Sequence, residues 1–288
     1  MITLSNNVEM PKLIMGTYLL KGKQLIDAVD KALSIGYRGF DTARYYENEQ
    51  DLGDALSVLL PRHNLRHDEI FIITKVFPSN AEASQQDVYS EIMTSINLLK
   101  RQYLDLVLVH YPRPLNTKDD DVLNKTYRKA AWLALEQMLK YKNARAIGVS
   151  NYEPRHLEEM KEYSIPAVPH VNQVEYHPHF QRGELRQYCQ SNGIHFQAFS
   201  PLGRGSQILL SDTTLKSIAE AHKTTVPTVI LAWIMKGNNS VVVKSATPER
   251  IEENFKALDL NLTDKEYADI SSCDLSTPHV EDDGWNVV

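Results

Sequence analysis

The sequence contains little of what marks several specialised classes of protein. Only two of its 288 residues are cysteines, which is too few for a disulfide framework and fits a reducing compartment. No apolar run approaches the roughly 20 residues that a membrane-spanning helix needs. Residues 1–7 lack the basic segment and apolar core of a secretory signal. We therefore expect a cytoplasmic protein with no membrane partner.

An excess of positive charge is also absent. The formal net charge is −6, which argues against a general nucleic-acid partner. Any site for an anionic ligand must therefore be local. The composition, with 42% hydrophobic and 24% charged residues, is ordinary for a globular protein. No sequence feature marks an obligate subunit interface, and we expect one domain over residues 1–288 that acts as a monomer.

Short apolar segments alternate with amphipathic helical segments from residue 13 onward. The expected strands lie near residues 13–15, 38–40, 70–73, 104–109, 144–149, 168–174, 194–199 and 241–243. Helical spacing follows them, as in Leu25, Val29 and Leu33 before Gly36. Eight such units predict α/β architecture with parallel strands joined by helical crossovers, closed into a (β/α)8 TIM barrel. The competing doubly wound sheet would carry a glycine-rich G-x-G-x-x-G turn, which is missing.

Several element boundaries are specific expectations. Residues 1–12 predict a short N-terminal β-hairpin that caps the barrel. Thr263 predicts the N-cap of an extra C-terminal helix over residues 263–273, followed by an acidic tail. The helix after the second strand is expected to end before Pro61. Residues 200–212 are expected to form a loop, and residues 213–235 and 248–258 to be helical.

Polar residues follow the predicted strands at a consistent position. In a closed parallel barrel, the C-terminal strand ends meet on the face where active sites of this fold lie. One polar residue there would indicate a satisfied core group, but several indicate a site. At or just after these strand ends come Asp41, Lys75, His110, Ser150, Asn151, Gln173 and Lys244.

Four residues, Asp41, Tyr46, Lys75 and His110, suit the protonation of a carbonyl oxygen. The pKa of an unperturbed tyrosine is about 10, too high for efficient proton donation near neutrality. A lysine ammonium beside Tyr46 would lower that pKa, and Asp41 would keep the ammonium charged and in place. His110 would hydrogen-bond the same substrate oxygen. The set predicts a proton donor aimed at a carbonyl that becomes an alkoxide.

The junction between the eighth strand and its helix predicts an anion site. Thr247 is a good N-cap residue, and a proline follows it at the first helical position. A helix N-terminus favours an anion, and Lys244 and Arg250 add two cations beside it. Arg250, Glu253 and Asn254 share one helical face. A phosphate next to a polar heterocycle fits this pattern, as in the adenosine 2′-phosphate of NADP.

Together these motifs resemble those of the aldo-keto reductase superfamily over nearly the whole chain. The similar stretches are residues 39–49, which contain Asp41-Thr42-Ala43 and Tyr46, and residues 106–112, 148–152, 172–178 and 244–254. The resemblance implies an NADP(H)-dependent (β/α)8 oxidoreductase that reduces aldehydes or ketones. It also implies a catalytic tetrad of Asp41, Tyr46, Lys75 and His110.

The resemblance further implies how NADPH would bind. The nicotinamide carboxamide would be held by Ser150, Asn151 and Gln173, and Phe199 would stack on the nicotinamide ring. The pyrophosphate would run along Leu202 and Gly203, while the 2′-phosphate and the adenine would meet Lys244, Ser245, Thr247, Arg250, Glu253 and Asn254.

The sequence departs from the family pattern around the substrate. Tyr18 and Tyr111 stand where several relatives carry tryptophan, and Phe199 stands where many carry tyrosine. We expect Tyr18, Tyr111 and Trp285 to line the pocket for a small-molecule carbonyl substrate. The loop after His110, the loop over residues 204–212 and the tail match no substrate-defined branch, so the substrate stays open.

Two other interpretations belong to different functional classes. His177 and His179 form an H-x-H pair after a predicted strand, as in a metal-dependent hydrolase. Zinc sites need several converging ligands, and no second cluster accompanies this pair, so we expect no metal site. A non-catalytic NADP-binding barrel serving as a regulatory or structural subunit is the other alternative. The complete set of four catalytic residues favours an enzyme.

Overall fold

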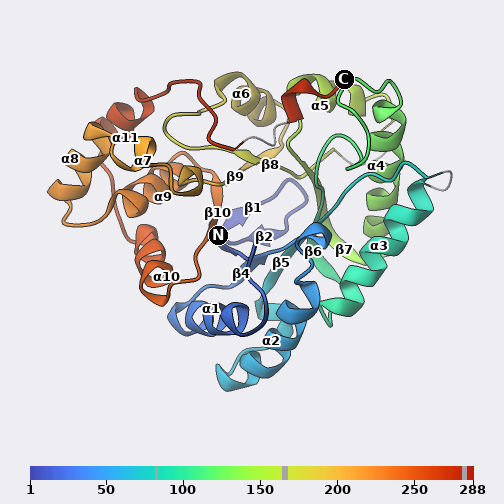
Figure 1. Cartoon of the computed structure of the whole chain (residues 1–288), viewed down its shortest axis with the longest axis horizontal. Helices are drawn as coiled ribbons and strands as arrows, with labels where there is room; N and C mark the ends of the chain where they lie inside the picture. The colour runs from blue at the N-terminus through green and yellow to red at the C-terminus, as the bar shows by residue number, and fades with distance from the viewer. Residues whose placement is uncertain (82–83, 164–167, 281–283) are drawn as a thin grey trace.

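The computed structural model describes residues 1–81, 84–163, 168–280 and 284–288. Its centre is a closed barrel of parallel strands in the order β10-β3-β4-β5-β6-β7-β8-β9 (Figure 1). The predicted (β/α)8 TIM barrel is therefore confirmed. The strands are β3 (Leu13–Gly16), β4 (Gly39–Asp41), β5 (Phe71–Val76), β6 (Leu104–Val109), β7 (Ala144–Ser150), β8 (Val171–Glu175), β9 (His195–Phe199) and β10 (Ser240–Lys244).

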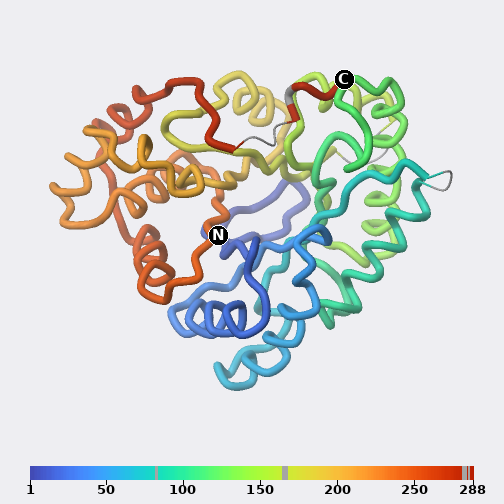
Figure 2. The backbone as a smooth tube through the Cα atoms, viewed as in Figure 1, coloured from blue at the N-terminus to red at the C-terminus, as the bar shows by residue number. Residues whose placement is uncertain are grey.

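Helices surround the barrel and connect consecutive strands (Figures 1 and 2). Within the described ranges, none of them is both long and apolar enough to cross a membrane. The principal helices are α1 (Gly22–Ile35), α2 (Glu49–Arg62), α3 (Ser84–Leu98), α4 (Asn124–Lys140), α5 (Pro154–Met160), α6 (Gly183–Ser191), α8 (Thr213–Ala221), α9 (Val226–Lys236), α10 (Pro248–Phe255) and α11 (Asp264–Ser271).

Helix α1 shows how apolar spacing produces this arrangement. Leu25, Val29 and Leu33 recur at helical spacing and are buried in the core. The helix ends at Gly36, whose φ of 112° lies in the left-handed region. A side chain there would be strained, and its Cβ would approach the Phe255 ring to 2.8 Å. The glycine therefore sets both the end of α1 and its packing on α10.

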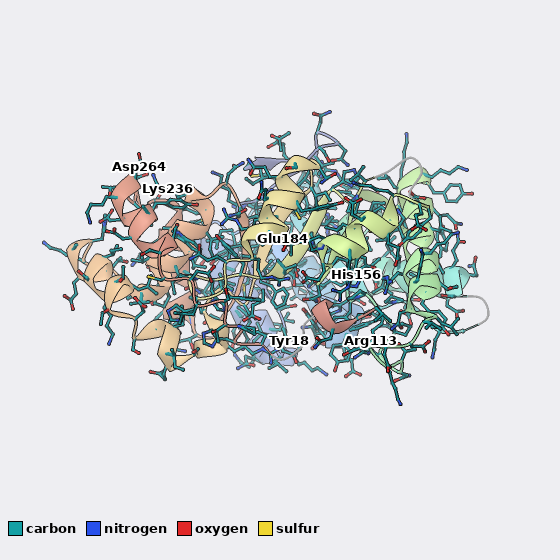
Figure 3. All side chains as sticks on the ribbon, turned by 90° about the horizontal axis from the view of Figure 1, so that it is seen from above. Tyr18, Arg113, His156, Glu184, Lys236 and Asp264 are labelled. Atoms are coloured by element: carbon teal, nitrogen blue, oxygen red, sulfur yellow. The ribbon has the colours of Figure 1, made fainter. Side chains whose placement is uncertain are left out.

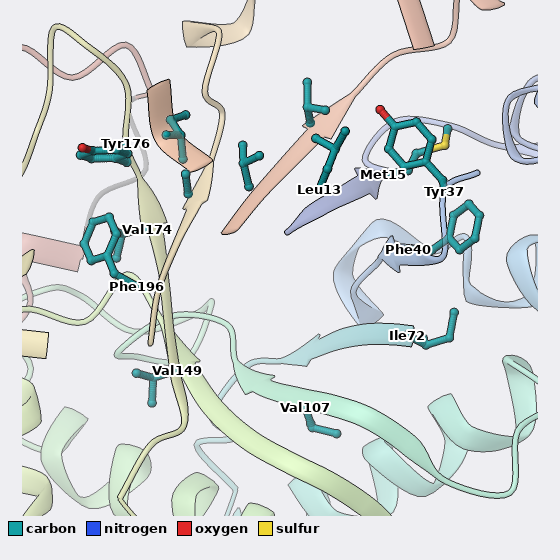
Figure 4. Packing of buried hydrophobic residues seen from close by; sticks show 14 of the residues in the cluster. Leu13, Met15, Tyr37, Phe40, Ile72, Val107, Val149, Val174, Tyr176 and Phe196 are labelled. Atoms are coloured by element: carbon teal, nitrogen blue, oxygen red, sulfur yellow. The ribbon is translucent and has the colours of Figure 1, made fainter. Parts of the chain in front are cut away.

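The strand side chains form two apolar layers, because successive residues of a strand point to opposite faces. The outer layer, between the strands and the helices, includes Leu13, Met15, Ile72, Val107 and Val149 (Figure 4). We call the apolar layer inside the barrel the inner cluster. Its strand residues are Ile14, Phe71, Ile73, Leu106, Leu108, Ala146, Val171 and Val242.

The predicted N-terminal hairpin is confirmed, with β1 (Ile2–Thr3) antiparallel to β2 (Glu9–Met10). Asn6 Nδ2 donates to the carbonyl oxygen of Arg145 at the start of β7, at 2.9 Å. The hairpin thus closes the N-terminal end of the barrel and adds its own apolar side chains to the inner cluster. Tyr18 and Arg113 lie on the face away from the hairpin (Figure 3).

Two predicted helix boundaries are wrong, and prolines explain both. Helix α2 continues through Pro61, because the His63 N–H donates to the carbonyl oxygen of Leu59 at 3.1 Å and closes the turn without the missing proline donor. The predicted helix over residues 213–235 is divided into α8 and α9. Pro227 lies in the first turn of α9, where its missing N–H has no partner to lose.

Two further expectations need correction. Strand β8 begins at Val171 and not at residue 168, since Pro169 has no N–H to donate to a neighbouring strand. Residues 200–212 contain a 3-10 turn (Gly203–Gly205) and a short helix, α7 (Gln207–Leu210). Ser206 provides the N-cap of α7 through its side-chain oxygen. This segment is therefore more ordered than a simple loop.

The extra C-terminal helix is confirmed as α11. Thr263 Oγ1 accepts a hydrogen bond from the Glu266 N–H at 3.2 Å, and the Glu266 carboxylate accepts one from the Thr263 N–H at 2.7 Å. This reciprocal pair is a capping box. The preceding helix is shorter than predicted, since α10 ends at Phe255 and Lys256–Leu258 forms a 3-10 turn.

Candidate active site

Asp41, Tyr46, Lys75 and His110 meet at the C-terminal mouth of the barrel, as the sequence predicted. Asp41 ends β4, Lys75 lies in β5, and His110 directly follows β6. Tyr46 ends the 3-10 turn Arg44–Tyr46, which follows β4. Three neighbouring strands and one short turn therefore position the whole set.

The ammonium of Lys75 uses all three of its donors at this site, two of them within the set. Its Nζ donates to Asp41 Oδ1 at 2.5 Å, to the carbonyl oxygen of Thr42 at 3.0 Å and to the Tyr46 hydroxyl oxygen at 3.2 Å. Both charged side chains of the pair are buried. Burial lowers the pKa of Lys75, but Asp41 and Tyr46 raise it more, so the net direction is upward and the lysine stays charged.

The pKa of Tyr46 responds to opposing influences. Burial of the phenol raises it, the charge of Lys75 lowers it, and the carboxylate of Asp41 raises it again. Lys75 therefore shifts the pKa of Tyr46 downward, as expected from the sequence. The net direction is nevertheless upward, because desolvation disfavours the phenolate more than Lys75 favours it. The lowered Tyr46 pKa expected from the sequence is therefore wrong.

His110 is held as a neutral imidazole. Burial and the nearby charge of Lys75 both lower its pKa, to well below the usual range. Its ring centre lies 5.7 Å from that of Tyr46 and 4.7 Å from that of Phe77. Its Nδ1 is buried without a hydrogen-bond partner among the described residues. A neutral ring can donate one N–H to a substrate oxygen next to Tyr46.

Asn48 holds the loop that carries Tyr46. Its Nδ2 donates to the carbonyl oxygens of Thr17 and Leu20 at 2.8 and 2.9 Å, and its Oδ1 accepts from Thr42 Oγ1 at 2.7 Å. The side chain is buried. Asn48 lies within residues 39–49, and nothing in the sequence marks its side chain as buried. Its burial, which explains why an amide is needed there, becomes visible in the structure.

The three residues predicted for the nicotinamide carboxamide lie beside the four-residue set. Ser150 Oγ donates to the carbonyl oxygen of Gln173 at 2.8 Å, and Asn151 Nδ2 donates to that of His110 at 3.1 Å. Gln173 Nε2 donates to Asp41 Oδ2 at 2.9 Å. These three predicted cofactor residues and the predicted catalytic residues thus form one hydrogen-bonded group.

The remaining predicted cofactor residues follow β9 and β10. Phe199 ends β9, Leu202 and Gly203 follow after two intervening residues, and Lys244 ends β10. Helix α10 begins after Thr247, which occupies the N-cap position but makes no capping hydrogen bond with its side chain. The group beyond β10 is Ser245, Thr247, Arg250, Glu253 and Asn254, of which Asn254 is buried and Arg250 is exposed.

The anion site predicted near α10 has suitable charge. Lys244 and Arg250 are exposed, and within the described part of the chain neither forms an ion pair. Ser245 Oγ accepts from the Thr247 N–H at 3.1 Å, which shapes the turn that precedes the helix. Two uncommitted cations therefore lie near the N-terminus of α10, an arrangement that suits a phosphate.

Aromatic rings surround the mouth near Tyr46 and His110. Tyr18 lies 4.9 Å from Tyr46 between ring centres, and Tyr111 lies 6.4 Å from Phe77. Both predicted pocket tyrosines are therefore close to the set. The side chain of Trp285 is not among those that the structure describes, so its predicted place in the pocket stays a prediction.

Two aromatic residues at the mouth were missed from the sequence. The Tyr45 ring centre lies 5.6 Å from that of Phe77 and 6.3 Å from that of His110. Phe77 comes two residues after Lys75, so its position past a strand end was a usable signal. Tyr45 adjoins Tyr46, and nothing in the sequence distinguishes a ring that faces the mouth from one in solvent.

The histidine pair considered for a metal is occupied by carboxylates. His177 Nε2 lies 3.0 Å from Glu175 Oε1, and His179 Nε2 lies 3.2 Å from Asp212 Oδ2. In the part of the chain that the structure describes, no three His, Cys, Asp or Glu side chains are grouped so that they could hold a metal ion. Glu175 also accepts the backbone N–H of His279 at 2.7 Å, which indicates a structural role for this pair.

Comparisons with known proteins agree with this geometry. The aldo/keto reductase family profile matches residues 12–275. An NADPH-dependent codeinone reductase 1-4 of Papaver somniferum is 37% identical over 288 residues, which cover 94% of this chain and 88% of that protein. A glyoxal reductase of Bacillus subtilis (strain 168) is 35% identical over 273 residues, covering 94% and 91%.

A solved structure is similar over its full length. It is an aldo-keto reductase enzyme from a Medee basin deep-sea metagenome library, with 33% sequence identity, a TM-score of 0.87 and 100% coverage of both chains. The family profile, the reductase relatives and the shared fold all support an oxidoreductase that reduces carbonyl groups. The chain belongs to the aldo/keto reductase family.

Proposed function

We propose that the protein uses NADPH to reduce aldehydes or ketones to alcohols, reversibly in principle, with Tyr46 as the proton donor. The observation that carries this proposal is the hydrogen bond that Lys75 Nζ donates to the Tyr46 hydroxyl oxygen. Because the Tyr46 oxygen accepts this hydrogen bond at 3.2 Å, the hydroxyl hydrogen of Tyr46 is left for a substrate oxygen. Relatives named as a glyoxal reductase and an NADPH-dependent codeinone reductase support the reaction and the cofactor.

Each residue of the set has a role in this reaction. When bound, NADPH supplies the hydride that the carbonyl carbon receives. Tyr46 gives its proton to the carbonyl oxygen as negative charge develops there, and Lys75 stabilises the phenolate that remains. Asp41 keeps Lys75 charged and in place. His110, which is neutral, donates a hydrogen bond that orients the same oxygen.

The residues present fit NADPH at both ends. Near Tyr46, Ser150, Asn151 and Gln173 offer hydroxyl and amide groups that match a carboxamide. At α10, Lys244 and Arg250 offer cations for a 2′-phosphate. The aromatic rings around the mouth favour carbonyl substrates with an apolar or aromatic substituent.

The first test measures NADPH oxidation by its absorbance over a panel of aldehydes, ketones and quinones. Tyr46→Phe removes the proton donor and keeps the ring, so kcat should fall about 10²–10⁴-fold. The dissociation constant for NADPH should stay within about twofold, because the ring that borders the site is retained. No turnover by the wild-type protein, or full turnover by Tyr46→Phe, would reject the proposal.

The second test concerns the cofactor. Arg250→Ala removes one exposed cation near the start of α10, and a lost charge-assisted hydrogen bond is worth about 1.5–3 kcal/mol. NADPH affinity should therefore fall about tenfold to hundredfold, while NADH affinity should be unchanged. Dissociation constants from fluorescence titration decide the matter, and equal losses for both cofactors would contradict the 2′-phosphate assignment.

A further inference from the structure

A continuous chain of hydrogen bonds crosses the barrel interior behind the proposed site. Gln173 Nε2 donates to Asp41 Oδ2 at 2.9 Å and also to Gln197 Oε1 at 2.7 Å. Gln197 Nε2 donates to Ser240 Oγ at 2.9 Å. Ser240 Oγ lies 2.9 Å from His195 Nε2. The chain therefore leads from Asp41 at the mouth to His195 at the start of β9.

Strand register produces this chain. Gln173 on β8 lies directly opposite Gln197 on β9, and Gln197 on β9 lies opposite Ser240 on β10. Cross-strand partners face the same side of a sheet, so these three side chains all point into the barrel. All three are buried. Asp41 is on β4, across the barrel from β8 in the strand order, and the amide of Gln173 spans the interior to reach it.

The chemistry of the partners leaves one orientation for every group in the chain. The Asp41 carboxylate accepts hydrogen bonds and has none to donate, so the Gln173 nitrogen must face it. The second N–H of Gln173 goes to the Gln197 oxygen, which turns the Gln197 nitrogen toward Ser240. The Ser240 backbone N–H donates to His195 Nε2 at 3.2 Å. His195 Nε2 therefore carries no proton, and it also accepts a hydrogen bond from the Ser240 hydroxyl.

This orientation has a consequence at the mouth. Both N–H groups of Gln173 are used behind the site, one by Asp41 and one by Gln197. Its Oε1 makes no hydrogen bond within the described ranges of the chain. An amide oxygen with free lone pairs can accept the N–H of a carboxamide. If the Gln173 amide turned over, its oxygen would face the Asp41 carboxylate and the Gln197 oxygen, leaving two repulsive contacts.

We propose that Gln197 is a positioning residue for the cofactor: it locks the Gln173 amide so that Oε1 is presented to the nicotinamide carboxamide. Gln197 contacts neither the cofactor nor the substrate. It acts through Gln173, and Ser240 in turn holds Gln197. This inference rests on the proposed function, because it takes the nicotinamide of NADPH as the group bound beside Ser150, Asn151 and Gln173.

If Gln197 had only a structural role, its replacement would not weaken NADPH binding selectively. Two ligands therefore distinguish a positioning role from a structural role. NADPH carries the nicotinamide, whereas adenosine 2′,5′-bisphosphate carries the 2′-phosphate and adenine without it. Gln197→Met keeps an unbranched side chain of similar length and removes the hydrogen bonds of Gln197 with Gln173, Ser240 and Met10 Sδ. Dissociation constants for the two ligands are measured by isothermal titration calorimetry, with the melting temperature of each variant.

We expect Gln197→Met to weaken NADPH binding about tenfold, the equivalent of one net hydrogen bond. Adenosine 2′,5′-bisphosphate should bind within about twofold of wild type, because its contacts lie near α10. Ser240→Ala releases Gln197 without altering it and also removes the hydroxyl that bonds His195 Nε2. It should shift the ratio of the NADPH and adenosine 2′,5′-bisphosphate dissociation constants in the same direction by a smaller factor. It also provides the test if Gln197→Met does not fold.

Leu106→Ala is the matched control. Leu106 is fully buried in the inner cluster, so its truncation loosens the same barrel without touching the polar chain. It should lower the melting temperature and leave the ratio of the two dissociation constants unchanged. If Gln197→Met and Ser240→Ala also leave the ratio unchanged while the wild-type protein binds NADPH and reduces carbonyls, the positioning role is rejected and the proposed function stands. A wild-type protein that does not bind NADPH overturns the proposed function and this inference with it.

Discussion

The interior of the barrel has an apolar side, lined by β5 and β6, and a polar side, lined by β8, β9 and β10. Strands β5 and β6 place Phe71, Ile73, Leu106 and Leu108 there, all apolar and all part of the inner cluster. Strands β8, β9 and β10 place amides, a hydroxyl and an imidazole at neighbouring positions, joined by hydrogen bonds. The polar side is not exclusively polar, because Val171 of β8 and Val242 of β10 also belong to the inner cluster.

The two sides differ in what they determine. Apolar contacts are non-directional and stabilise the barrel roughly in proportion to the area they bury. Hydrogen bonds between buried groups are directional. A buried donor or acceptor left without a partner costs more free energy than the hydrogen bond contributes. The apolar side therefore contributes stability, whereas the polar side determines the orientation of Gln173. The apolar side and the polar side meet at the Asp41–Lys75 pair. Lys75 lies two residues after Ile73 on β5, and Asp41 accepts a hydrogen bond from Gln173.

The largest expected effect on stability comes from disrupting the Asp41–Lys75 ion pair. Lys75→Met leaves the Asp41 carboxylate buried without its cation, which should cost about 3–5 kcal/mol of unfolding free energy. Urea denaturation at neutral pH measures this loss. Adding Asp41→Asn removes the unpaired charge, so the double variant should recover most of the stability while remaining inactive. A single variant as stable as wild type would contradict the view that the pair is buried.

The next effect tests the apolar side alone. Leu106→Ala removes a fully buried side chain from the inner cluster and should cost about 2–5 kcal/mol of unfolding free energy. Below its melting temperature, the variant should keep kcat within about twofold of wild type, because distant sites act nearly independently. Parallel denaturation and kinetic assays check both parts. A large loss of kcat in the folded variant would mean that the two sides are not separable.

The smallest effect concerns pH and the far end of the polar side. Burial lowers the pKa of His195 to about 4, below the value of about 6.5 in an unfolded chain. The unfolded state therefore binds a proton that the folded state lacks between these two pH values. Stability from this group is complete above about pH 6.5 and is lost as the pH falls toward about 4.

His195→Asn should remove this dependence. Between about pH 6.5 and pH 4, the slope of unfolding free energy against pH should decrease by up to about 1.4 kcal/mol per pH unit, the value for one proton. Urea denaturation over that range measures the slope. His156 is buried more completely than His195, and burial lowers its pKa to about 3, so part of the acid sensitivity should persist. An unchanged slope would show that His195 is accessible to protons in the folded protein.

Much of the fold was predictable from the sequence because its signals are local. The alternation of apolar strands with amphipathic helices, the hairpin at residues 1–12 and the capping box at Thr263 each depend on residues close together in the chain. Two of the errors, at the end of α2 and between α8 and α9, arose where a proline has two possible effects. Pro61 is accommodated in the last turn of α2, while Pro227 lies in the first turn of α9. Which applies depends on whether neighbouring donors close the turn.

The site was predictable to the extent that strand ends converge. Asp41, Lys75 and His110 could be brought together from sequence, because parallel strands of a closed barrel all end at one mouth. Phe77 shared that signal and was overlooked. The direction of the Tyr46 pKa could not be derived, since desolvation depends on atoms packed around the phenol from several elements.

The sequence by itself determined the barrel, the four residues at its mouth and the cation-bearing start of α10, because strand ends and caps are local features. Only the tertiary structure decided that Gln173, Gln197 and Ser240 form one chain that ends at Asp41. That outcome depends on strand register, which pairs residues more than 20 positions apart, and on closure of the barrel, which brings β4 and β8 within reach of one amide. A one-residue shift in register would turn each side chain to the other face of the sheet and break the chain.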